Sequence, residues 1–174
     1  LLHAVLTQTL TVTPPDALIT VENLTQWNVN AFLLELHKVP QPILDAFNEN
    51  GWTFVIGTEY LSDLSRKLGV NCIGAAAYTE KRIYVSEASA VLHEFGHFLD
   101  CAMGFPQEHK DLYALEAASA SMKQHAKSNS LEYFAEFFAY WLSGSTRTLA
   151  QLKELTPETY VYFESLEIAH WFSA

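Results

Sequence analysis

The chain has 174 residues, of which 49% are apolar and 13% aromatic, so we expect one domain with a sizeable buried core. Acidic residues outnumber basic ones by 20 to 10, and the net charge is −10. This charge, without any Lys/Arg cluster to meet phosphates, argues against a nucleic-acid partner or an anionic membrane surface. No apolar run is long enough to span a bilayer.

The sequence begins at Leu1 without a Met or a signal-peptide pattern, so we expect a processed or trimmed fragment. It shows no internal repeat, low-complexity tract or interdomain linker, and we therefore expect a single domain over residues 1–174. Cys72 and Cys101 are not spaced as a metal site. Their apolar neighbours favour two free buried thiols over a disulfide.

The first half of the chain mixes short strands and helices. The expected elements are a break at Thr13–Asp16, a strand at Leu18–Val21, a helix or strand at Asn30–Lys38, a helix from Pro40 to Asn50, a buried strand at Trp52–Ile56 and a short helix at Leu61–Leu68.

A hairpin follows, with strands at Ile73–Tyr78 and Arg82–Val85 around the turn Thr79–Lys81. The small residues from Gly74 to Ala77 leave the first strand almost bare of side chains. Two interpretations stay open: close packing against a helix, or an edge that accepts an extended peptide by strand addition.

The second half is predominantly helical. The expected helices are Ala88–Met103, Gln107–His125, Ser130–Leu142 and a closing helix at Thr156-Pro157-Glu158, where Thr156 is the N-cap and proline takes the first helical position. Strands with helices, followed by helices alone, indicate an α+β fold: a small mixed sheet with a helical C-terminal half.

The helix Ala88–Met103 carries the pattern His93-Glu94-Phe95-Gly96-His97. Two histidines four residues apart project from one face of a helix and can bind one Zn²⁺. Glu94 lies beside that pair, where it can act as general base toward a zinc-bound water. The pattern alone is only moderately specific, so its surroundings must decide.

A catalytic zinc needs a third protein ligand, and the helix Ser130–Leu142 offers two candidates. This helix is apolar nearly all round, and its only charges, Glu132 and Glu136, share one face. Burial of two carboxylates is costly unless a cation or donors meet them. One could bind the metal while the other holds a ligand histidine by its free N–H. Alternatively, the glutamates face solvent or cap the helix, since Asn129 and Glu132 fit a capping box.

Other titratable residues are less informative. Asp100 lies one turn beyond His97 on the same face, and it fits equally a residue behind the metal ligands or a solvated aspartate at the helix end. His3, His37, His109 and His170 lie outside any such pattern, and we interpret them as ordinary structural or surface histidines.

The motif His93–His97 with Asp100, followed by Glu132-Tyr133-Phe134-Ala135-Glu136, resembles the catalytic domain of anthrax lethal factor and the smaller secreted Pro-Pro endopeptidases of that superfamily. The likeness extends from Lys81–Val85 to Thr156–Tyr160. It implies a zincin-like fold and a zinc endopeptidase. His93, His97 and Glu132 are then the ligands, Glu94 the base, and Glu136 a residue behind the ligands.

One departure from the family concerns the oxyanion. The family carries a tyrosine seven residues before the ligand glutamate, where it donates to the tetrahedral intermediate, and this chain has His125 there. An imidazole N–H can also donate to a developing oxyanion. His125 is therefore a candidate catalytic residue, and the substitution alternatively indicates a weakened enzyme.

The resulting hypothesis is a zinc-dependent endopeptidase with one catalytic Zn²⁺ that hydrolyses peptide bonds, with proline beside the cleaved bond as one option. Its partner is a protein or peptide substrate, and the resemblance implies a secreted location. The alternative is a catalytically impaired lethal-factor-like domain that serves as a protein-binding module of a toxin. Substrate choice and oligomeric state stay open.

Overall fold

The computed structural model describes residues 6–12 and 17–172, so the expected break at Thr13–Asp16 and His3 lie outside the described residues. The chain forms two compact units that divide between Phe95 and Gly96. The division falls inside one continuous helix, α4 (Val91–Ala102). We describe each unit by itself.

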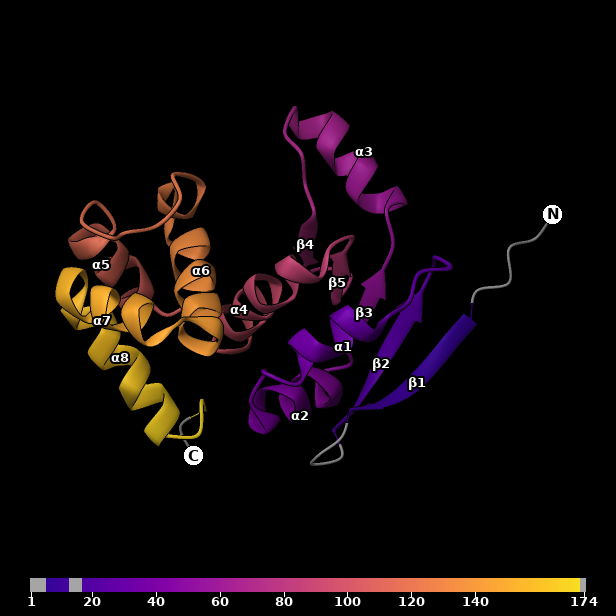
Figure 1. The fold of residues 1–174 in the computed structure, drawn as a ribbon, viewed down its shortest axis with the longest axis horizontal. Coiled ribbons are helices and arrows are strands. Elements are labelled where there is room, and N and C mark those ends of the chain that lie inside the picture. Colours follow the sequence, from indigo (N-terminus) through magenta and orange to yellow (C-terminus); the bar gives the residue numbers. More distant parts are fainter. Residues whose placement is uncertain (1–5, 13–16, 173–174) are drawn as a thin grey trace. The chain divides into compact units, whose positions relative to one another are not determined.

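The first unit is built on a five-stranded mixed sheet in the order β1-β2-β3-β5-β4 (Figure 1). Its strands are β1 (Leu6–Val12), β2 (Ala17–Asn23), β3 (Thr53–Ile56), β4 (Gly74–Ala77) and β5 (Arg82–Val85). β2, β3 and β5 run parallel, and the outer strands β1 and β4 pair antiparallel with β2 and β5. The expected hairpin is confirmed as β4 and β5.

The helices of the first unit cover the parallel strands, whose apolar residues are buried on both faces. They are α1 (Asn30–Leu36), α2 (Gln41–Glu49), α3 (Glu59–Leu68) and the 3₁₀ turn η1 (Ala88–Ala90). Phe95 on α4 stacks on Phe54 of β3 and lies 5.0 Å, between ring centroids, from Phe47 of α2. On the other face, Val55 and Tyr84 form a cluster with Leu61 of α3. These contacts fix the start of α4 against the sheet.

The second unit is helical and centres on α6 (Ser130–Ser143). Its other elements are the remainder of α4, α5 (Gln107–Glu116), the 3₁₀ turn η2 (His125–Lys127), α7 (Thr146–Leu155) and α8 (Pro157–Ile168). Phe134 and Phe137 of α6 pack against Phe163 of α8, with ring centroids 5.2 and 4.7 Å apart. The predicted burial of this apolar helix is confirmed.

The α+β class and the zincin-like small mixed sheet are confirmed, whereas one helical prediction is wrong in extent. The predicted helix Gln107–His125 ends at Glu116, because the residues that follow are mostly small or polar and supply little apolar area for burial. The chain then turns back, and the Tyr113 hydroxyl donates to the Lys127 carbonyl. Helix α7 follows Ser145 and was not among the expected helices; the Ser145 hydroxyl caps it by accepting from the Thr148 N–H.

Thr156 and Pro157 take the predicted N-cap and first helical positions of α8, but the Thr156 side chain does not cap the helix. The Thr156 hydroxyl donates to the Leu152 carbonyl instead of accepting from the first turn of α8. Glu116, only 6% exposed, supplies the cap: Oε1 accepts from the Glu158 N–H, and Oε2 accepts from the N–H and hydroxyl of Thr159. A carboxylate at a helix N-terminus satisfies otherwise unpaired N–H groups and interacts favourably with the helix dipole.

In the part of the chain that the structure describes, no helix is both long and apolar enough to cross a membrane. Cys72 and Cys101 are not joined by a disulfide, as predicted, but each is only partly buried.

Glu116→Gln should lower the free energy of unfolding by roughly 2 kcal/mol, because a buried charged acceptor is lost and an amide N–H₂ then faces backbone donors. Urea denaturation monitored by circular dichroism measures this change. Glu49→Gln, an exposed position on α2, is the control and should leave stability within about 0.5 kcal/mol of the native chain.

Candidate metal centre

Helix α4 holds both histidines of the sequence motif. Its buried side chains Phe95, Phe98 and Leu99 anchor it in the core, while His93 is half-buried and His97 is 7% exposed. Because the helix is continuous from Val91 to Ala102, the two imidazoles leave it one turn apart on one face.

Gly96 lets α6 approach α4 to backbone contact. A Cβ atom built on Gly96 would lie 2.6 Å from the Ala135 Cα and 2.9 Å from its carbonyl oxygen, closer than real side chains tolerate. Only glycine therefore fits between His93 and His97 at this crossing. A glycine in the middle of an apolar helix is a signal of close packing, so this role of Gly96 could have been predicted from the sequence.

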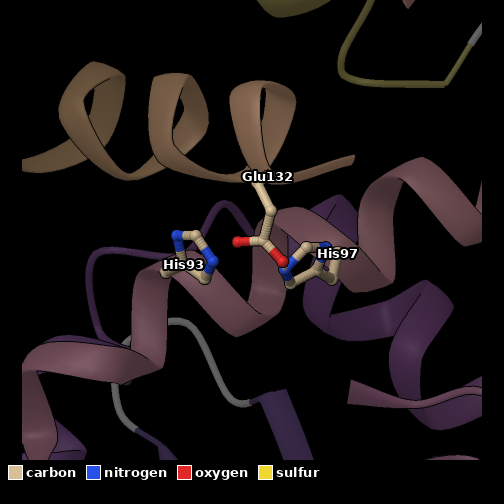
Figure 2. A group of neighbouring side chains, drawn as sticks. All are labelled: His93, His97 and Glu132. Atoms are coloured by element: carbon tan, nitrogen blue, oxygen red, sulfur yellow. Dashed lines mark ion pairs between the residues drawn. The ribbon is translucent and has the colours of Figure 1, made fainter. Parts of the chain in front are cut away.

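Glu132 lies in the first turn of α6, three residues before Ala135. Its backbone N–H donates to the Asn129 side chain at 3.0 Å, which confirms the predicted cap. Its Oε1 lies 3.6 Å from the His97 Nε2. Figure 2 shows the Glu132 carboxylate pointing from α6 toward both imidazoles of α4.

One nitrogen from each of His93 and His97 and one oxygen from Glu132 all lie within 4.8 Å of one another. Donor atoms around a tetrahedral zinc lie roughly 3.3 Å apart, given bond lengths of about 2.0–2.1 Å. Small side-chain adjustments would close this difference. Two imidazoles and a carboxylate are also a donor set typical of catalytic zinc, so the residues fit the ion.

Glu94 is 5% exposed and contacts strand β4 of the first unit. A side chain at Gly74 would overlap the Glu94 carboxylate and would approach the Ala90 Cβ to 2.9 Å. Close packing against a helix is thus the correct interpretation of Gly74, and the packed group is the candidate base. β4 is also an edge strand of the described sheet, so an extended peptide could still pair with it.

His125 lies beside the candidate ligand, on η2. Its Nε2 is 3.0 Å from the Glu132 Oε2, while 75% of its side chain is exposed. The ring therefore lies beside Glu132 and is open to solvent.

The two residues expected behind the ligands have different surroundings. Glu136 is half-buried, and its carboxylate accepts a hydrogen bond from the Tyr140 hydroxyl. The pKa of Tyr140 is raised, mainly by burial and secondly by the nearby Glu136 carboxylate. Asp100 is 1% exposed, so it is not a solvated residue at the helix end. Its Oδ1 lies 2.7 Å from the Nδ1 of His109, which is itself buried.

Comparisons with known proteins were made on sequence and on fold. The family model described as "Anthrax toxin lethal factor, N- and C-terminal domain" matches residues 57–166. Among solved structures, the chain is similar to the Pro-Pro endopeptidase PPEP-2 from Paenibacillus alvei, with a TM-score of 0.63 and 21% identity. That alignment covers 84% of this chain and 96% of the other, and it shows a shared fold. No curated protein matches this chain.

Gly96→Ala should lower the free energy of unfolding by roughly 1–3 kcal/mol, because α4 and α6 must separate to admit the methyl group. The same separation should weaken Zn²⁺ binding, since Glu132 and His97 come from the two helices. Urea denaturation and a competitive zinc titration measure both effects.

Gly57→Ala is the matched control, because a Cβ there meets only the Leu24 side chain at an ordinary 3.4 Å. Native-like stability and zinc affinity in Gly96→Ala would contradict the described contact between the helices.

Proposed function

Because the chain belongs to the anthrax toxin lethal factor family, we propose that it is a zinc-dependent endopeptidase whose metal is held by His93, His97 and Glu132. The observation that carries this proposal is the cluster of their three donor atoms within 4.8 Å. A zinc ion held by this set would supply a Lewis acid that activates water and polarises a peptide carbonyl.

Glu94 is the proposed general base. It follows His93 directly on α4, and its carboxylate is buried against Gly74 of the edge strand. In the proposed reaction Glu94 takes a proton from the attacking water as the new C–O bond forms. It then delivers that proton to the amine nitrogen as the peptide C–N bond breaks.

His125 is the proposed oxyanion donor. Its position beside Glu132 and its exposed ring support this role, because a donor must reach the substrate carbonyl as negative charge develops on the oxygen. The ring N–H then does what the tyrosine hydroxyl does in the family that the sequence resembles.

The edge strand β4 is the proposed substrate platform. An extended peptide that pairs with β4 brings its main chain beside Gly74, where the Glu94 carboxylate lies. A proline next to the cleaved bond is our proposal for specificity, supported by the name of the similar structure, a Pro-Pro endopeptidase. A secreted location stays a prediction.

The substitution of the family tyrosine by His125 favours one second candidate function. In that case the domain binds zinc but cleaves no peptide, and it serves as a protein-binding module of a toxin.

Glu94→Gln should retain one zinc per chain and lower kcat/KM at least about 100-fold, because the proton transfers lose their base while the ligands stay in place. Metal analysis of the gently purified protein and cleavage of a proline-containing peptide library measure the two effects. Glu49→Gln, an exposed glutamate on α2, is the control.

Absence of zinc from the native chain would overturn the proposed function. Stoichiometric zinc without cleavage of any peptide would favour the protein-binding module instead.

His125→Phe should lower kcat by about 100-fold or more with unchanged zinc content, because one oxyanion donor is lost. His125→Tyr should retain most of the native kcat, since it restores a hydroxyl donor. His37→Phe, at an exposed position after α1, is the control for loss of an imidazole.

Full activity of His125→Phe would show that His125 is not the donor. A loss of zinc affinity with the kcat of the zinc-loaded protein preserved would instead assign His125 to holding Glu132.

A further inference from the structure

A buried network of three polar side chains in the second unit begins at Asp100, three residues after His97 on α4. His109 on α5 is 3% exposed and stands between Asp100 on α4 and Tyr162 on α8. Its Nδ1 lies 2.7 Å from the Asp100 Oδ1, and its Nε2 lies 2.8 Å from the Tyr162 hydroxyl. The imidazole also stacks on Phe134 of α6, with ring centroids 4.0 Å apart and planes within 14°. His109 is therefore held on three sides.

The hydrogen bonds of His109 to Asp100 and Tyr162 depend on where the protons of the three side chains lie. Burial, followed by the nearby Glu108 and Asp100 carboxylates, raises the pKa of Tyr162, so its hydroxyl keeps its proton. The Asp100 Oδ1 accepts as a carboxylate oxygen, so the His109 Nδ1 carries a proton and donates to it. The His109 Nε2 shares a second hydrogen bond with the Tyr162 hydroxyl. These two bonds fix the imidazole, and the imidazole in turn holds one oxygen of the Asp100 carboxylate.

The second oxygen of Asp100 stands apart from the other buried polar atoms. Among the described residues, its Oδ2 is the buried side-chain atom without a hydrogen-bond partner. An unsatisfied buried carboxylate oxygen is costly and calls for a donor or a cation that completes the site. His97 precedes Asp100 by three residues, and residues so spaced are neighbours on a helix face.

Glu116 shows what a purely structural carboxylate looks like in the same unit. Both of its oxygens accept hydrogen bonds, and the three donors all belong to the first turn of α8. Asp100 also joins helices, through His109, but only one of its oxygens is used. A hydrogen bond that only joined α4 to α5 would not require the second Asp100 oxygen to be buried without a hydrogen-bond partner.

We propose that His109 is a positioning residue for the metal centre: it holds the Asp100 carboxylate so that its second oxygen is available to accept from the imidazole of His97, its neighbour on α4, and adds negative charge near this ligand. His109 touches neither metal nor substrate and acts through Asp100. A carboxylate that holds a ligand histidine fixes its ring and raises its basicity. The inference rests on the proposed function, since it assigns His97 as a zinc ligand.

Zinc affinity of the metal-free protein tests this inference without reliance on catalysis. We expect His109→Phe and Asp100→Asn each to raise the zinc dissociation constant roughly 10- to 100-fold in competition with a chelator. Cobalt substitution gives a second readout, because a misoriented His97 should change the visible absorption bands of bound Co²⁺. Tyr162→Phe, which removes only the hydroxyl that orients His109, should weaken zinc binding less.

Glu116→Gln is the matched control. It alters a buried hydrogen-bonded carboxylate of the same unit and should lower stability while leaving the zinc dissociation constant and the Co²⁺ spectrum as in the native chain. Urea denaturation of each metal-free variant separates a loss of folding from a loss of affinity.

Native zinc affinity and a native Co²⁺ spectrum in folded His109→Phe would overturn the inference and leave the proposed function intact. If His109→Phe does not fold, Asp100→Asn decides, because it keeps the shape of the side chain, and native affinity there also overturns the inference. A native chain that binds no zinc overturns the inference and the proposed function together.

Discussion

The candidate site depends on one contact, that between Gly96 and the backbone at Ala135. Helices that carry ordinary side chains at their crossing pack 8–10 Å apart. Without a Cβ at Gly96, α6 comes close enough for the short Glu132 side chain to reach the imidazole of His97. The close approach of Glu132 to His97 thus depends on the missing side chain of Gly96 as well as on the two ligands themselves.

The carboxylates of the second unit differ in which groups compensate their charge. Each such group must be compensated by donors or by a cation, and the kind of compensation indicates its role. Glu116 is satisfied entirely by the start of α8, which makes it part of the scaffold. Glu132 lies against imidazoles that share its site, and Asp100 is satisfied on one oxygen only. Among the described residues, the buried carboxylate oxygen without a hydrogen-bond partner therefore belongs to Asp100, three residues after the candidate ligand His97.

Local signals in the sequence predicted local structure well. The spacing of His93 and His97, the Asn129 cap and the β4–β5 hairpin each depend on residues close together in the chain, and the structure contains all three. Features that depend on distant residues were missed. The cap of α8 comes from Glu116, some forty residues earlier, and the chain after α5 turns back so that the Tyr113 hydroxyl donates to the Lys127 carbonyl. Spacing alone could not separate Glu132 from Glu136; the structure places Glu132 beside His97.

The packing of Glu94 against Gly74 fixes the candidate base next to the sheet. Gly74 pairs with Val85 in a fixed register, so the candidate base is located relative to the backbone ladder of β4. A peptide that pairs with β4 can shift only in steps of two residues if its side chains are to keep the same faces. In a peptide paired with β4, the residues on the two sides of the bond nearest Gly74 would point to opposite faces of the sheet, so alternate substrate residues would meet different surroundings.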